Sequence, residues 1–150
     1  RWAGKWSTEF GPEYEITSIL GETHSFTSKE YWEIFVNNVA ASVGACQLHL
    51  HAGEQLLFAA VPASGTAYPL ALETPTSATT GRTFKVKVVY FNGKGIAKPL
   101  SGATVSVAGH SGKTNAHGIV PLTPSHAGTF VLDAAHAGYV RAAPVTVHVS

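Results

Sequence analysis

Two histidines, His49 and His51, form the residue pattern that most directly suggests chemistry in this sequence. Residues two apart in a β-strand point to the same side, and two imidazoles on one side can bind zinc. No third histidine lies nearby, and Cys46 would face the other way on a regular strand. We therefore keep His49 and His51 as a weak candidate metal site. The simpler interpretation is that exposed histidines supply polarity.

Other catalytic patterns are incomplete. Residues 107–114 end like a phosphate-binding loop, but Val107 stands where that loop needs a glycine, and the sequence that follows does not predict the required helix. No serine lies in a Gly-x-Ser-x-Gly elbow, Asp133 is the only aspartate, and the glutamates are scattered. We expect neither catalytic activity nor a cofactor from these patterns.

The charge and hydropathy of the chain limit the kinds of partner that we expect. Ten Lys and Arg residues against nine Asp and Glu residues leave a net charge of +1, and the basic residues do not cluster. Nucleic acid binding needs a concentrated basic patch, so we expect no nucleic acid partner. No apolar run approaches the roughly 20 residues that span a bilayer, so we expect no membrane span.

The pattern of apolar residues indicates strands. These residues mostly alternate with polar ones, or form short β-branched and aromatic runs bounded by Gly, Pro, Asn and Ser. Asn37-Asn38 and Asn92-Gly93 predict tight turns. We therefore expect a mainly β fold. Its expected strands cover 14–19, 31–37, 46–50, 55–61, 83–91, 103–108, 118–122, 129–134 and 145–149.

The length of 150 residues fits one large domain or two small ones, and the segment 69–80 favours two. Pro69 and Pro75 lie there among several threonines, and proline removes ladder donors and stiffens the chain. We expect a first domain at 1–68, an extended linker at 69–80 and a second domain at 81–150.

Aromatic residues are concentrated in the first segment, above all in the run YWEIFVN at 31–37. Alternation places the even-numbered residues of this run on one face of its strand and the odd-numbered residues on the other. One face must fill the core. The other, if uncovered, is a flat aromatic surface suited to a glycan, a corrinoid or a partner protein. The candidate ligand-binding residues are Tyr31, Trp32, Phe35 and Asn37.

Five short motifs in the first segment resemble a known family. They are WAGKW at 2–6, YEITSILGE at 14–22, YWEIFVNN at 31–38, GAC at 44–46 and LHAGEQLLF at 50–58. In this order they resemble the transcobalamin-like β-grasp domains of bacterial exported proteins, with Glu54 in place of the usual Asp. The resemblance implies a secreted or cell-surface location. In vertebrate relatives this domain forms one half of a cobalamin-binding clamp, so the resemblance makes cobalamin a conceivable ligand.

The resemblance also implies that part of the domain is missing. A complete domain of this family has a leading β-hairpin and a helix before the segment that matches at Trp2. We expect that part to be a removed or separate N-terminal fragment, or the open sheet edge to pair with a second copy. Family members with the Gly-Ala-Cys motif pair its cysteine with one in the leading segment. Cys46 is thus a candidate for a disulfide to a cysteine outside this chain, and a small buried thiol is the other interpretation.

Residues 81–150 are similar to bacterial immunoglobulin-like modules and to carboxypeptidase-regulatory-like sandwiches. The matching elements are PLSGATV at 99–105, KTNAHG at 113–118, GTF at 128–130 and AGYVR at 137–141. Gly102 lets the chain enter a strand at a turn, and the Thr-Asn-Ala-x-Gly run predicts a corner that leads into 119–122. The similarity implies an immunoglobulin-like β-sandwich, which fixes fold better than function.

These patterns together predict an exported binding module that is not an enzyme. In this hypothesis the sandwich presents the β-grasp unit, which contacts a ligand or a protein partner at the surface around 31–37. Capture of a cobalamin-like small molecule on the same surface is the alternative. A structural spacer of a larger surface protein is the third hypothesis.

Overall fold

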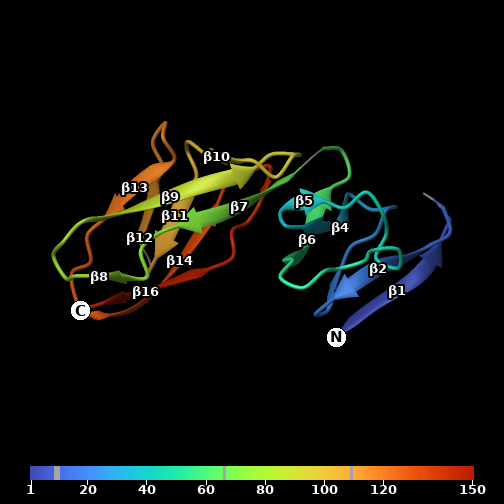
Figure 1. Ribbon diagram of the computed structural model, residues 1–150, viewed down its shortest axis with the longest axis horizontal. Helices are drawn as coiled ribbons and strands as arrows, with labels where there is room; N and C mark the ends of the chain where they lie inside the picture. Colours follow the sequence, from blue (N-terminus) through green and yellow to red (C-terminus); the bar gives the residue numbers. More distant parts are fainter. Residues whose placement is uncertain (9–10, 66, 109) are drawn as a thin grey trace. The chain divides into compact units, whose positions relative to one another are not determined.

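The computed structural model describes residues 1–8, 11–65, 67–108 and 110–150. Its regular elements are β-strands, which confirms the expected mainly β fold class (Figure 1). The described part of the chain contains no helix that could cross a lipid bilayer. Contacts divide the chain into a first unit, Arg1–Ala67 with Gly93–Gly95, and a second unit, Tyr68–Asn92 with Ile96–Ser150.

The first unit contains two three-stranded antiparallel sheets. In each sheet a seven-residue strand lies in the middle and pairs with a strand on either side. The first sheet is β1 (Trp2–Ser7), β2 (Glu13–Ile19) and β3 (Glu22–Thr23), and the second is β5 (Val39–Ala40), β4 (Glu30–Val36) and β6 (Leu56–Pro62). The strands expected at 14–19, 31–37 and 55–61 are therefore confirmed within a residue or two at each end.

The hairpin between β4 and β5 turns at Asn37 and Asn38, as the sequence predicts. Their φ angles of 50° and 66° are the left-handed values that a two-residue hairpin turn requires, and asparagine tolerates them. Asn37 Oδ1 also accepts the N–H of Gln55 at 3.0 Å, and the Asn37 N–H donates to the Gln55 carbonyl at 2.9 Å. Asn37 thus anchors the end of β4 against the residue that precedes β6.

Residues 46–50, expected as a strand, form a turn and irregular chain instead. The Gln47 N–H donates to the Gly44 carbonyl at 3.0 Å, which closes the turn. An alternating run becomes a strand only where its backbone groups pair with another strand, and no described strand pairs with 46–50. The strand on which the candidate pair His49 and His51 depended is therefore absent.

The second unit is a sandwich of two five-stranded sheets. In the first sheet β9 (Phe84–Phe91) pairs with β7 (Tyr68–Glu73), β10 (Ala97–Pro99) and β13 (Ile119–Leu122), and β15 (Tyr139–Val140) pairs with β7. The second sheet runs in the order β12 (His110–Lys113), β11 (Thr104–Val107), β14 (Gly128–Ala135), β16 (Val145–Val149) and β8 (Ser77–Ala78). The alternate residues of both inner faces form one core. Its fully buried members include Val86, Val88, Val105, Leu132 and Val147.

Residues 69–80, expected as an extended linker, form β7 and β8 instead. The ladder between β7 and β9 runs from Leu70 to Glu73, and the Glu73 carboxylate pairs with Lys87 at 2.9 Å. Pro69 precedes this ladder and Pro75 lies between the two strands, so neither proline interrupts the pairing with β9. The composition of 69–80 suggested a linker because it does not show the strands that pair with this segment, β9 and β16, which lie later in the sequence.

The corner predicted from the Thr-Asn-Ala-x-Gly run is confirmed. Buried Thr114 donates its hydroxyl to the Leu100 carbonyl at 2.6 Å and accepts the Ala103 N–H at 3.0 Å. Asn115 Oδ1 accepts the N–H of His117 at 2.9 Å and that of Ile119 at 3.1 Å. The two side chains satisfy backbone groups that the turn removes from the ladder, and the chain enters β13.

Candidate functional site

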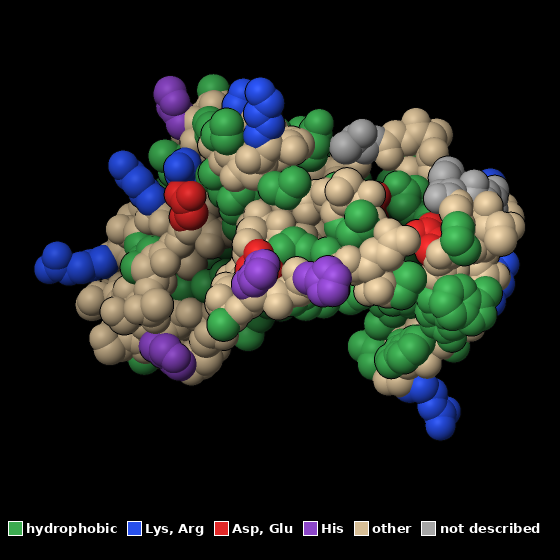
Figure 2. All heavy atoms as spheres, turned by 45° about the vertical axis from the view of Figure 1, so that its right-hand side comes forward, with side chains coloured by type: hydrophobic (Ala, Val, Ile, Leu, Met, Phe, Trp, Pro, Cys, Tyr) green, Lys and Arg blue, Asp and Glu red, His purple; other side chains and the backbone are tan. Residues whose placement is uncertain are grey.

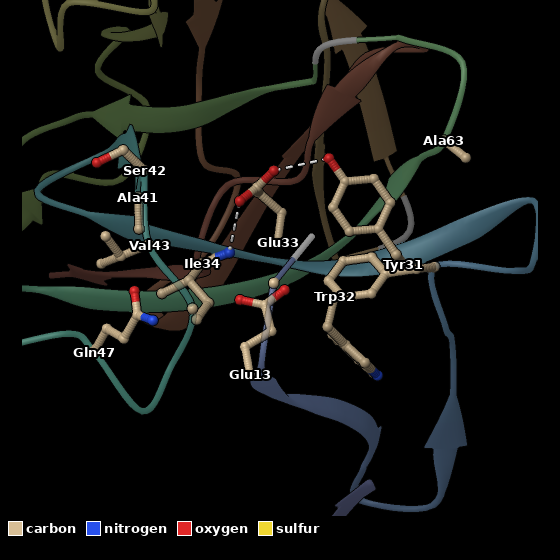
Figure 3. Close-up of a pocket in the computed structure, with 13 residues that line it drawn as sticks. Glu13, Tyr31, Trp32, Glu33, Ile34, Ala41, Ser42, Val43, Gln47 and Ala63 are labelled. Atoms are coloured by element: carbon tan, nitrogen blue, oxygen red, sulfur yellow. Dashed lines mark hydrogen bonds between the residues drawn. The ribbon is translucent and has the colours of Figure 1, made fainter. Parts of the chain in front are cut away.

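A pocket of about 530 Å³ opens in the first unit beside β4 (Figure 3). Tyr31 and Glu33 point to one side of this strand, and Trp32 and Ile34 point to the other. The other walls come from β2, from the loop before β4 and from the loop after β5. The lining combines aromatic Phe26, Tyr31 and Trp32 with acidic Glu13 and Glu33 and polar Ser42 and Gln47.

Glu33 is held in place by two hydrogen bonds. Its Oε2 accepts the Tyr31 hydroxyl at 2.9 Å, and its Oε1 accepts the N–H of Ile34 at 3.1 Å. Two donors on one carboxylate restrict its rotamers, so a charged group stands at a fixed point in the pocket.

The second carboxylate belongs to Glu13, at the start of β2. Gly44 makes room for it, because a Cβ at Gly44 would collide with Glu13 Oε2. Among the described residues, no cation forms an ion pair with Glu13 or Glu33. The pocket therefore carries two carboxylates that the described cations do not neutralise.

Two further contacts position the aromatic walls. The Phe26 N–H donates to the buried Glu15 carboxylate at 2.7 Å, which ties the loop before β4 to β2. The Trp32 ring lies 5.0 Å from the His24 ring in an edge-to-face arrangement. Trp32 Nε1 is buried and has no hydrogen-bond partner among the described residues.

The environment of Tyr31 raises its pKa to about 12, through burial first, then through the hydrogen bond to Glu33 and the charge of Glu33. The change Glu33→Gln removes the charge and replaces the carboxylate acceptor by an amide oxygen. We expect the pKa of Tyr31 to fall toward its ordinary value of about 10 but to stay above it, because burial persists. Titration of the ¹³Cζ resonances of labelled tyrosines by NMR measures this shift residue by residue.

Glu54→Gln is the matched control, since Glu54 accepts the N–H of His51 and does not line the pocket. It should leave the Tyr31 titration unchanged, and an unchanged titration in Glu33→Gln would assign the whole shift to burial. The raised pKa also makes the free energy of unfolding depend on pH. Protonated Tyr31 contributes its full share to that free energy below its unfolded pKa of about 10. That contribution is lost as the pH rises from about 10 to the folded pKa of about 12.

The structure separates the four candidate ligand-binding residues. Tyr31 and Trp32 line the pocket, whereas Phe35 is only 3% exposed and Asn37 serves the hairpin turn. Ile34 is also buried, so both faces of β4 are partly covered and no flat aromatic face extends along the whole strand. Sequence reasoning missed Glu13, Phe26 and Gln47 as pocket residues, because they come from other elements.

His49, His51 and Cys46 are exposed. No group of three or more His, Cys, Asp or Glu side chains in the described ranges could hold a metal ion. Cys46 is a free thiol here, and its pairing with a cysteine of another chain stays a prediction.

A second, apolar cavity of about 610 Å³ lies on the sheet of β1 and β2, and we call it the aromatic groove. Tyr14 lies between Trp2 and Trp6, edge-to-face with both at centroid distances of 6.0 and 5.6 Å. The two tryptophans are 65% and 72% exposed, and hydrophobic side chains gather on the surface of this unit in Figure 2. The groove is lined by Trp2, Trp6, Tyr14, Ile16, Ile19, Ala45, Cys46 and Phe58.

Comparison with known proteins bears on the same unit. No curated protein and no solved structure matches the chain. Residues 4–60, which include most of both sheets and most of the residues of both cavities, match the model of a family described as a domain of unknown function (DUF4430).

Proposed function

We propose that this chain is an exported or cell-surface binding module without catalytic activity, and that its first unit binds a ligand in the pocket at Tyr31 and Trp32. The match of residues 4–60 to the DUF4430 family supports the view that this unit is a transcobalamin-like β-grasp domain. The second unit then serves as an immunoglobulin-like structural module. Its two sheets and single core support that assignment.

One observation carries the proposal. The pocket combines aromatic side chains with the carboxylates of Glu13 and Glu33, which form no ion pair with the Lys, Arg or His side chains that the structure describes. Its volume of about 530 Å³ falls within the range of small-ligand sites. Aromatic faces attract cations by about 0.5–2 kcal/mol, and a fixed carboxylate adds charge attraction. The ligand that fits this chemistry has an ammonium or guanidinium group on an apolar body.

A matched pair of probes tests the charge requirement. Phenethylamine is cationic at neutral pH, whereas phenethyl alcohol has the same ring and chain without the charge. We expect the amine to shift the backbone amide resonances of Tyr31, Glu33 and Ile34 in a saturable way, and the alcohol to shift them at least tenfold more weakly. Two-dimensional NMR of the labelled chain measures both titrations.

Two substitutions make the test specific to the site. Glu33→Gln and Glu13→Gln should each weaken amine binding about 5- to 30-fold, the equivalent of a hydrogen bond or ion pair of about 1–2 kcal/mol. Glu54 does not line the pocket and offers the control, Glu54→Gln, which should bind the amine normally. Equal binding of amine and alcohol would contradict a cation site, and binding of neither would remove the small-ligand function.

Capture of a cobalamin-like compound remains the second candidate, favoured by the two aromatic side chains, Tyr31 and Trp32, that border the pocket. It predicts a change in the visible absorption spectrum of cobalamin on titration with the chain, and an unchanged spectrum removes it. A structural spacer is the third candidate, which fits a chain that binds neither probe.

A further inference from the structure

The outer edge of β1 has no partner strand among the residues that the structure describes. Within the described residues β1 pairs only with β2, so one row of its backbone N–H and C=O groups has no strand beside it. The Gly4 carbonyl accepts the Tyr14 hydroxyl at 2.9 Å, and a second lone pair of this oxygen is left for a strand N–H. Such an edge is a template for pairing with another strand. The extra residue in this pair lies in β2, near Thr17, because Ala3 faces Ser18 while Gly4 faces Ile16. The regular alternation of β1 is therefore intact along its whole length.

The same strand has a symmetric sequence. In Trp2-Ala3-Gly4-Lys5-Trp6 a tryptophan stands two residues to either side of Gly4. If two copies of β1 pair antiparallel with Gly4 opposite Gly4, each Trp2 lies opposite Trp6 of the second copy. All four indoles then lie on one face, because directly opposed residues share a face. On the other face each Ala3 lies opposite Lys5 of the second copy, so no like charges meet.

This register continues the aromatic groove across the edge. Within one copy the face of Trp2 and Trp6 already holds Tyr14, Ile16 and Ile19. Pairing would join two such faces into one sheet of six strands and place the exposed indoles next to one another. The contact is isologous, the form in which most homodimers assemble.

The expected area indicates a weak dimer. A tryptophan buries about 150–250 Å² in full, so four that are 65–72% exposed bring roughly 400–700 Å². Stable interfaces bury about 1,200–2,000 Å² in total, and the paired strands and their neighbours must supply the rest. We therefore expect a Kd in the micromolar range or weaker.

We propose that the open edge of β1 is a homodimer interface, formed by antiparallel pairing of two copies with Gly4 at the twofold axis. The inference is independent of the pocket at Tyr31, and it assigns the aromatic groove to a second copy of this chain.

Sedimentation over concentrations from about 1 µM to about 1 mM tests the proposal. The expected result, in reducing buffer, is a reversible shift from the chain mass of 15.7 kDa to twice that mass. Trp6→Ala should weaken the dimer at least tenfold, because both indole pairs lose a partner. Leu50→Ala changes another exposed apolar residue of the first unit, 49% exposed, and should leave the Kd unchanged.

Opposite charges at one position test the register itself. Ala3 is exposed and would face Lys5 of the second copy. Ala3→Glu should tighten the dimer and Ala3→Lys should weaken it, each about 2- to 30-fold, because each change acts twice across the axis. High salt should shrink both effects.

Three outcomes would overturn the proposal. The first is a chain that stays monomeric at every concentration. If the tryptophan emission of that monomer also shifts when an apolar dye is added, the groove is assigned to a small ligand. Another is a dimer that disappears on reduction, which would place the contact at Cys46. The third is a dimer indifferent to the sign of the charge at position 3, which would exclude this register.

Discussion

Leu132→Ala is expected to lower the free energy of unfolding of the second unit by about 2–5 kcal/mol. Leu132 lies in β14, is 0% exposed, and packs in the core that both sheets share. The substitution removes apolar surface from that core and leaves a cavity that a close-packed interior fills only in part. Guanidinium unfolding followed by far-UV circular dichroism measures the loss.

Its neighbour on the same strand supplies the control. Val131 is 51% exposed, so Val131→Ala should change the free energy of unfolding by no more than about 0.5 kcal/mol. A similar loss for both substitutions would contradict the assignment of inner and outer faces to β14.

Gly118→Ala is expected to destabilise the second unit by about 2–4 kcal/mol, for two separate reasons. Gly118 has a φ of 74°, which strains any residue with a Cβ. That Cβ would also lie 2.6 Å from the Val88 carbonyl oxygen and 3.1 Å from the Leu100 nitrogen. These two groups hydrogen-bond to each other at 3.0 Å, so relief of the clash disturbs the ladder beside β9. The same unfolding experiment measures the loss.

Gly138→Ala separates the two reasons. Gly138 has a similar φ of 81°, but a Cβ there meets nothing within 4 Å. It should cost only the backbone strain, about 1–2 kcal/mol. If both substitutions cost the same, the close approach to Val88 adds nothing and the φ angle alone decides.

Local signals accounted for much of the fold. The alternation of β9 and β16, the asparagine pair at the β4–β5 hairpin and the corner at Thr114 and Asn115 are all properties of a few adjacent residues. Each has a conformation that its own side chains favour, so the sequence alone predicts it.

The two segments whose secondary structure was expected wrongly both concern pairing between distant segments. Residues 46–50 alternate like a strand but pair with no described strand, whereas 69–80 looks like a linker and pairs with β9 and β16. Whether each segment forms a strand depends on backbone hydrogen bonds to a strand elsewhere in the sequence. The composition of about ten adjacent residues does not show which strand will supply them.

The residues of the candidate site also divide into those that the sequence could identify and those that it could not. Tyr31 and Trp32 could be singled out because their strand is rich in aromatic residues, and both line the pocket. Phe35 satisfies the same criterion but is buried, since alternation does not tell which side of a strand is covered. Glu13 joins the pocket from β2 only because two sheets come together in space, and no spacing along the chain records that contact.

The parallel pairing at the two ends of the second unit has a mechanical consequence. β8, near the start of this unit, pairs in parallel with β16 at the end of the chain. The bonds that close this pair include His148 N–H to Thr76 O at 2.9 Å and Ser150 N–H to Ala78 O at 3.0 Å. A pulling force applied through the two strands loads these bonds in shear, so they resist together and do not unzip one after another. Tension between the start of β8 and the end of β16 therefore meets several bonds at once.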